Sequence, residues 1–199
     1  MCKILEKSFY NSEMGKCIVI YTSKRGSTKQ YAEWIAEDLC CRAVPLDDAM
    51  KEGIDLHDYD CVIYGGWIRG SGIVDFDKFS RLLDADTMSR LIVYGVGVAD
   101  ETAENYAQVW GYSIGKIDPK NENGAIMYIL GGRYAPEKVT GMDGFLMKIM
   151  RKVLLSGSTP DARAQADKIR ERIDNGVDMV SRDNIASLVK DARKKTEGK

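Results

Sequence analysis

Five short apolar runs, separated by stretches with helical periodicity, are the feature that most constrains how this chain can fold. The runs are rich in β-branched residues and lie at 16–21, 42–46, 61–64, 91–94 and 125–130. A run that is apolar on both faces is typical of a strand buried within a parallel sheet. Between the runs, apolar residues recur at helical spacing over 27–39, 75–83 and 101–110. The pattern predicts right-handed strand–helix–strand crossovers and a three-layer α/β sandwich around five parallel strands.

The C-terminal part of the sequence shows a different pattern. After residue 132 we expect no further strand, and three helical patterns follow at about 143–155, 160–174 and 182–195. The sheet needs only one more covering helix, so two of the three are interpreted as an insertion. We therefore expect a single domain over 1–199, with an N-terminal extension at 1–15 and a helical insertion at about 133–181.

Composition excludes several classes of function. The 29 basic and 30 acidic residues nearly cancel, which argues against a nucleic-acid partner. With His57 as the single histidine, sites that need two imidazoles are excluded. The five cysteines show no C-x-x-C spacing, so we expect reduced thiols and no metal site. No stretch approaches 18 consecutive apolar residues and the first residues carry scattered charges, which predicts a cytoplasmic protein.

The loop after the first run carries the strongest local signal. It places hydroxyl and cationic side chains around one glycine, directly before a predicted helix. The free N–H groups and positive dipole end of a helix N-terminus form an anion site, which predicts phosphate binding. The alternative is a helix N-cap followed by a solvated turn, because Ser and Thr favour that position anyway. Neither a Walker A motif nor a G-x-G-x-x-G fingerprint occurs. The candidate ligands are Thr22, Ser23, Lys24, Arg25, Gly26, Ser27 and Thr28.

Two further glycine-bearing segments follow the third and fourth runs, and we interpret both as loops. Ligands of open α/β sheets bind at the carboxyl ends of the strands, where these segments and the first loop are expected to meet. For Trp67 the alternative is a partly buried surface aromatic. The candidates in the second loop are Gly65, Gly66, Trp67, Ile68, Arg69 and Gly70, and those in the third are Gly95, Val96, Gly97, Val98 and Asp100.

Taken in order, the three loops resemble those of flavodoxins. This chain has Ser23, Arg25, Gly26 and Thr28 in the places that correspond to the flavodoxin phosphate loop T-x-T-G-x-T. The resemblance implies a flavodoxin-like sandwich with strand order 2-1-3-4-5 and noncovalently bound FMN. It also implies that the isoalloxazine ring lies between the second and third loops, where Trp67 would contact it.

Within this group, the chain is most similar to the menaquinone-dependent protoporphyrinogen oxidase family. The similarity is carried by TSKRGSTKQYAEWIAEDL at 22–39, by GGWIR at 65–69, and by GGRY followed by FLMKIMRKVLL. It departs from that family at Arg25, where an acidic residue is usual, and in the acidic stretch GVADETAENYAQVW at 97–110. The resemblance implies an oxidoreductase that passes electrons from a reduced organic substrate, such as a porphyrinogen, to a quinone-like acceptor. No catalytic side chain is expected, and the candidate substrate-facing residues are Trp67, Arg69, Arg133 and Tyr134.

Two other functions stay open. The chain could be an electron-carrier module that docks on larger redox proteins, or a regulatory domain that has lost its flavin. Mobile carriers are usually strongly acidic, whereas this chain has a net charge of −1 and a basic surplus beyond residue 130.

The predicted helix at 143–155 has an unusually wide apolar side. Its cations, Lys148, Arg151 and Lys152, gather on the opposite side of the helical wheel. We expect the helix at 160–174, or a second subunit of a homodimer, to bury the apolar surplus. The alternative is contact with a quinone or with anionic lipid at the inner face of a membrane. Its apolar residues are Phe145, Leu146, Met147, Ile149, Met150, Val153 and Leu154.

Overall fold

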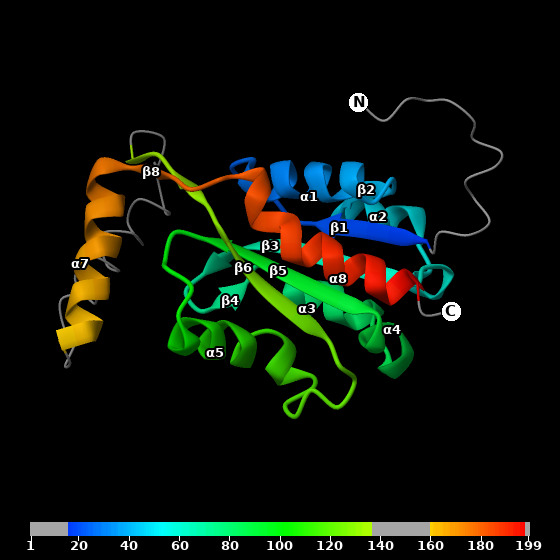
Figure 1. Cartoon of the computed structure of the whole chain (residues 1–199). Helices are drawn as coiled ribbons and strands as arrows, with labels where there is room; N and C mark the ends of the chain where they lie inside the picture. The colour runs from blue at the N-terminus through cyan, green and yellow to red at the C-terminus, as the bar shows by residue number, and fades with distance from the viewer. Residues whose placement is uncertain (1–15, 137–159, 198–199) are drawn as a thin grey trace.

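The centre of the molecule is a parallel sheet. The computed structural model describes residues 16–136 and 160–197, and its long strands follow the order β2-β1-β3-β5-β6 (Figure 1). All four neighbouring pairs in this row are parallel. The α/β sandwich and the order 2-1-3-4-5 of its five long strands are therefore confirmed. These strands are β1 (Cys17–Tyr21), β2 (Arg42–Pro45), β3 (Cys61–Arg69), β5 (Leu91–Gly97) and β6 (Ile126–Gly131).

Helices cover both faces of this sheet, as the periodicity predicts. One face packs on α1 (Ser27–Asp38) and α8 (Ala186–Glu197), through buried residues such as Ile35 and Leu188. The other face packs on four shorter helices, which contribute buried residues such as Phe79 and Val109. These helices are α2 (Leu46–Glu52), α3 (Phe76–Phe79), α4 (Ala85–Ser89) and α5 (Ala103–Gly111). Short 3-10 turns lie at η1 (Leu56–Asp58), η2 (Ser80–Leu82), η3 (Ile114–Lys116) and η6 (Arg182–Ile185).

Two short helices and one hairpin were not predicted from the sequence. Neither α2 nor α4 is long enough to show two turns of apolar periodicity. The strand β4 (Gly72–Ile73) folds back antiparallel on the end of β3, which continues to Arg69. The long β3 and β5 therefore include residues that we expected in loops.

The expectation that no strand follows residue 132 is wrong. The strands β7 (Arg133–Tyr134) and β8 (Val177–Asp178) pair antiparallel beyond the end of β6. Strands of two residues carry no periodicity, so only the fold reveals their pairing. Between them, α7 (Pro160–Asn175) agrees with the predicted helix at 160–174 and stands beyond the end of the sheet, next to β8 (Figure 1).

The helix predicted at 143–155, with its proposed membrane or quinone contact, lies outside the described residues. Across 16–136 and 160–197, no helix has both the length and the apolar character needed to cross a bilayer.

Candidate functional site

A cavity of ≈ 250 Å³ lies at the carboxyl edge of the sheet. Residues from all three segments that we singled out line it, together with residues that follow β6 and one residue of α7. This is where parallel α/β sheets bind ligands. The predicted residues that line the cavity are Lys24, Arg25, Ser27, Thr28, Trp67, Ile68, Arg69, Gly70, Val96, Gly97 and Val98, joined by Arg133 and Tyr134.

The N-terminus of α1 offers hydrogen-bond donors at this cavity. Gly26 is the N-cap with a φ of 93°, and no side chain caps the helix. The first amide that pairs within the helix is that of Gln30, which donates to the Gly26 carbonyl at 2.8 Å. The amides of Ser27, Thr28 and Lys29 donate to no other described residue. Unpaired donors at the positive end of a helix dipole attract an anion.

Other residues of the same loop face elsewhere. Thr22, Ser23 and Gly26 line a second hollow of ≈ 380 Å³, beside Leu46 of α2. The hydroxyl oxygens of Thr22 and Tyr64 lie 3.3 Å apart, and the Tyr64 hydroxyl donates to the Val74 carbonyl at 2.8 Å. The predicted phosphate loop is therefore divided between two hollows, and only Lys24, Arg25, Ser27 and Thr28 of the loop line the first cavity.

Gly65, Gly66 and Gly95 lie inside strands, which corrects our interpretation of them as loop residues. Gly65 pairs with Tyr94, and Gly66 pairs with Gly95. A Cβ atom on Gly65 would lie 2.0 Å from the Tyr94 ring, and one on Gly66 would lie 2.7 Å from a methyl group of Ile73. These glycines make room for core side chains. None of the three lines the cavity.

The end of β5 and the residues after it form a second set of donors. The carbonyls of Gly97, Val98 and Asp100 each accept a hydrogen bond: from the Gly132 amide at 2.6 Å, from the Arg172 guanidinium at 2.7 Å, and from the Asn105 side chain at 3.0 Å. The amides of Val98, Ala99 and Asp100 donate to no other described residue. A planar ring that carries carbonyl oxygens could accept from such donors.

Asp100 itself does not line the cavity. Its carboxylate pairs with Arg172 at 2.6 Å and with Lys168 at 3.5 Å, both on α7. The hydrogen bond from Arg172 is the main reason why the pKa of Asp100 lies below its usual value. The structure therefore gives this predicted site residue a role in holding α7.

Charged and aromatic side chains complete the wall on the β7 side. The Arg25 guanidinium lies 5.9 Å from the centre of the buried Tyr134 ring, a cation–π geometry. Burial raises the pKa of Tyr134, and the nearby charge of Arg25 opposes that shift. Arg133 donates to Asp178 at 2.6 Å across the β7–β8 pair.

The sequence analysis missed four residues that line the cavity. Ala99 lies within a segment that we had singled out, and Gly132 directly follows β6. Asn105 and Ile169 belong to α5 and α7, and no local signal distinguishes either of them from an ordinary helix residue. Within the described part of the chain, no group of three His, Cys, Asp or Glu side chains gathers as a metal site.

Sequence comparison assigns the family. The profile of the flavodoxin domain family matches residues 18–161, well over half of the chain, and the protein therefore belongs to this family. Membership implies a flavin-binding redox module. The match is to the family as a whole and does not single out the protoporphyrinogen oxidases. A search of curated proteins found no match.

Solved structures with a similar fold are distant in sequence. Trp repressor binding protein from Bacillus subtilis is 16% identical with a TM-score of 0.43, over 72% of this chain and 99% of that one. A flavodoxin from the domain Archaea is 15% identical with a TM-score of 0.41, over 80% and 99%. The flavodiiron core of Flv1 from Synechocystis sp. PCC6803 is 15% identical with a TM-score of 0.42, over 61% of this chain but only 32% of that one.

Proposed function

We propose that the cavity at the carboxyl edge binds FMN noncovalently and that the protein is an FMN-dependent oxidoreductase. One observation carries the proposal: two sets of backbone donors that have no partner among the described residues occur at a single cavity. The N-terminus of α1 suits a phosphate group, and the amides of Val98 and Ala99 suit the carbonyl groups of a flavin ring. The residues present therefore fit this cofactor.

The chain's own part in the reaction is binding and orientation. The amides of Ser27 and Thr28 would hold the phosphate, and Trp67 would pack against the ring. Bound FMN would supply electron-transfer chemistry that needs no side-chain acid or base. His57, the single histidine, lies before β3 at the opposite edge of the sheet and takes no part.

The electron donor in this proposal is a reduced organic substrate, with a porphyrinogen as the candidate, and the acceptor is quinone-like. Support comes from the resemblance described above and from the lining of the cavity. Trp67 and Tyr134 offer apolar rings there, and Arg69 and Arg133 offer cations for an anionic group on the substrate. Turnover of protoporphyrinogen with a menaquinone analogue tests this step. Reduction and reoxidation only by a partner protein would instead identify a carrier module.

The binding proposal is tested with the flavin-free protein. We expect a yellow protein after purification, and we expect FMN to bind about 10- to 100-fold more tightly than riboflavin, because charge-assisted hydrogen bonds hold the phosphate. Titration by flavin fluorescence measures both affinities. Equal affinities would show that the N-terminus of α1 does not hold the phosphate. Failure to bind either compound would contradict the function.

A further inference from the structure

The helix α7 is bonded to the segment that follows β5. One nitrogen of the Arg172 guanidinium donates to the Val98 carbonyl at 2.7 Å, and the other donates to the Asp100 carboxylate at 2.6 Å. Lys168, one turn earlier, lies 3.5 Å from the same carboxylate. The Arg172 side chain is only 21% exposed, so water competes with these bonds less than at an open surface. Arg172 therefore links α7 to the backbone of Val98 and to the side chain of Asp100, two residues of the segment that follows β5.

Peptide geometry gives the bond to Val98 a consequence for the cavity. The carbonyl of one residue and the amide of the next belong to a single rigid trans plane and point in opposite directions. Arg172 therefore fixes the direction of the Ala99 N–H, which points away from the guanidinium. The Gly132 amide, which donates to the Gly97 carbonyl, fixes the Val98 N–H in the same way. Both amides lack a partner among the described residues, and both residues line the cavity.

The attachment of α7 does not depend on Arg172 alone. Ala166 and Ile173 are buried, and Ile169, between them in sequence, lines the cavity. These three residues share one face of the helix, because they are three, four or seven positions apart, and Arg172 lies beside that face, three positions after Ile169. Apolar packing and the β7–β8 pair therefore hold α7 next to the sheet when the guanidinium is removed.

We propose that Arg172 is a positioning residue for the flavin ring and that α7 forms a wall of the cofactor site. The guanidinium orients the amide donors after β5 toward the ring, and Ile169 closes the cavity on the side of α7. The proposal rests on the flavin-binding function proposed above. It assigns a role in the site to a helix that is not part of the central sandwich.

Two variants of α7 separate positioning from general stability. Arg172→Ala removes both bonds to the segment after β5. Arg170→Ala is the matched control, because Arg170 pairs with Asp167 of the same helix at 3.3 Å. We expect Arg172→Ala to weaken FMN and riboflavin binding by the same factor, about tenfold, since the lost contact acts on the ring and not on the phosphate. The absorption bands of the bound flavin should shift, Arg172→Lys should restore part of the affinity, and Arg170→Ala should match the original protein.

A flavin-free measurement separates this inference from the proposed function. NMR order parameters of the amides at 98–100 should fall toward the flexible range in Arg172→Ala and stay unchanged in Arg170→Ala. If the original protein binds no flavin, the function fails while these order parameters still test the positioning. If it binds flavin but Arg172→Ala changes neither affinity, spectrum nor amide order, the positioning role is overturned. Should Arg172→Ala fail to fold, Arg172→Met decides, because it keeps an aliphatic side chain and removes both bonds. Weaker binding of both flavins supports the role, whereas no change in affinity, spectrum or amide order overturns it.

Discussion

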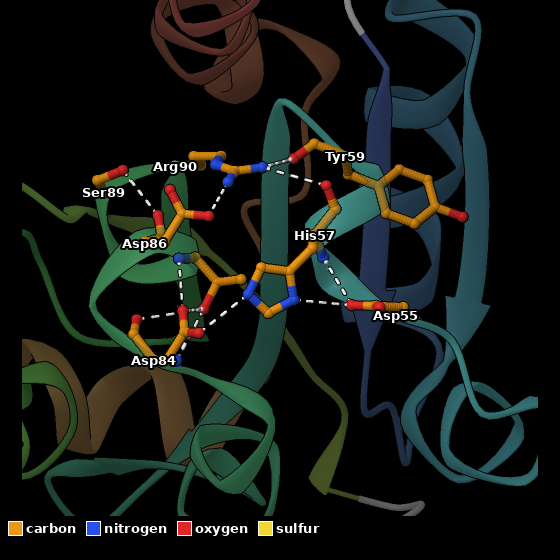
Figure 2. A network of polar contacts seen from close by, with 8 residues as sticks. Asp55, His57, Tyr59, Asp84, Asp86, Ser89 and Arg90 are labelled. Carbon is orange, nitrogen blue, oxygen red and sulfur yellow. Dashed lines mark hydrogen bonds and ion pairs between the residues drawn. The ribbon is translucent and has the colours of Figure 1, made fainter.

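Polar groups cluster at both edges of the sheet, but the two clusters differ in whether these groups are hydrogen-bonded within the protein. At the carboxyl edge, backbone donors from α1 and from the segment after β5 lie at a cavity and have no partner within 16–136 and 160–197. At the amino edge, polar side chains satisfy one another. Figure 2 shows His57 between two carboxylates, with its ring nitrogens 2.8 Å from Asp55 and 2.9 Å from Asp84. Polar groups without partners beside a cavity indicate a ligand-binding site. Polar groups that hydrogen-bond to one another indicate a structural role.

The amino-edge cluster, formed by Asp55, His57, Asp84, Asp86 and Arg90, connects two segments that precede strands. His57 belongs to η1, ahead of β3, and Asp84 caps α4, ahead of β5. Arg90 continues the network: it pairs with Asp86 and donates to the carbonyls of His57 and Tyr59 (Figure 2). A single histidine in a sequence suggests a catalytic role. Here the imidazole instead connects η1 to the start of α4 through its hydrogen bonds. The comparison leads to four predictions, described below from the largest expected effect to the smallest.

The largest effect should come from Gly65→Ala, which tests whether this part of β3 is core. The new Cβ would lie 2.0 Å from the ring of Tyr94, which is fully buried and cannot move aside. We expect a loss of about 3 kcal/mol in the free energy of unfolding, measured with denaturant. Gly111→Ala is the control, because nothing lies within 4 Å of its Cβ position. A Gly65→Ala protein of normal stability would restore the loop interpretation.

Two glycines with left-handed backbones, one at each edge, form the next test. Gly26 has a φ of 93° at the start of α1, and Gly53 has a φ of 64° at the end of α2. Substitution by alanine should lower the free energy of unfolding by about 1–2 kcal/mol at each position, because a left-handed backbone is strained for a residue with a Cβ. Both positions have open space around the Cβ, so no clash adds to this cost. Only Gly26→Ala should also weaken FMN binding, by about tenfold or more, as measured by fluorescence titration. Equal FMN affinities in the two variants would contradict the phosphate site.

A smaller effect is expected at Trp67, which lines the cavity. Trp67→Phe should weaken FMN binding by about fivefold, because part of the stacking contact with the ring is lost. It should also remove most of the tryptophan fluorescence quenching that FMN causes. Trp110→Phe is the matched control, since Trp110 stacks on Tyr106 and does not line the cavity. Quenching that survives in Trp67→Phe would place the ring elsewhere.

The smallest effect should be the pH-dependent contribution of His57. Its hydrogen bonds to Asp55 and Asp84 raise the pKa of His57, while bonds from Thr87 and His57 lower the pKa of Asp84 to about 2. A raised histidine pKa stabilises the fold below its usual value, near 6.5, and the contribution fades as the pH rises through the folded value. Below about pH 4 the carboxylates become protonated in the unfolded chain, and the advantage shrinks again.

We therefore expect His57→Gln to lower the thermal unfolding midpoint most near pH 5.5 and least near pH 9, with FMN affinity unchanged. NMR titration of the single imidazole should give a pKa above 6.5 that falls in Asp84→Asn. A pKa that is not raised, or a loss of flavin binding in His57→Gln, would contradict the contrast between the two edges.

Much of the fold could be predicted from local patterns. Buried strands such as β1 and amphipathic helices such as α1 carry their own apolar periodicity, so their order along the chain indicates the sandwich. The cluster of loops at one edge follows from the parallel arrangement. The same reason singles out Trp67 and four residues of the loop at 22–28, namely Lys24, Arg25, Ser27 and Thr28.

Other features of the site could not be predicted, because they depend on residues distant in sequence. Gly65 and Gly66 suggest a turn, but the side chains of Tyr94 and Ile73 occupy the space beside them. Arg172 is an ordinary helix cation until the fold brings it to Val98 and Asp100, more than 70 residues away (|i−j| of 74 and 72).

The sequence by itself determined the parallel sandwich, the edge of the sheet at which the cavity lies and the family to which the chain belongs, because short-range periodicity and loop composition encode all three. Only the tertiary structure decided which polar groups have partners. His57 links Asp55 to Asp84, and α7 forms a wall of the cavity, because the fold brings Asp84 to His57 and Ile169 to the carboxyl edge, contacts that chain spacing alone does not make.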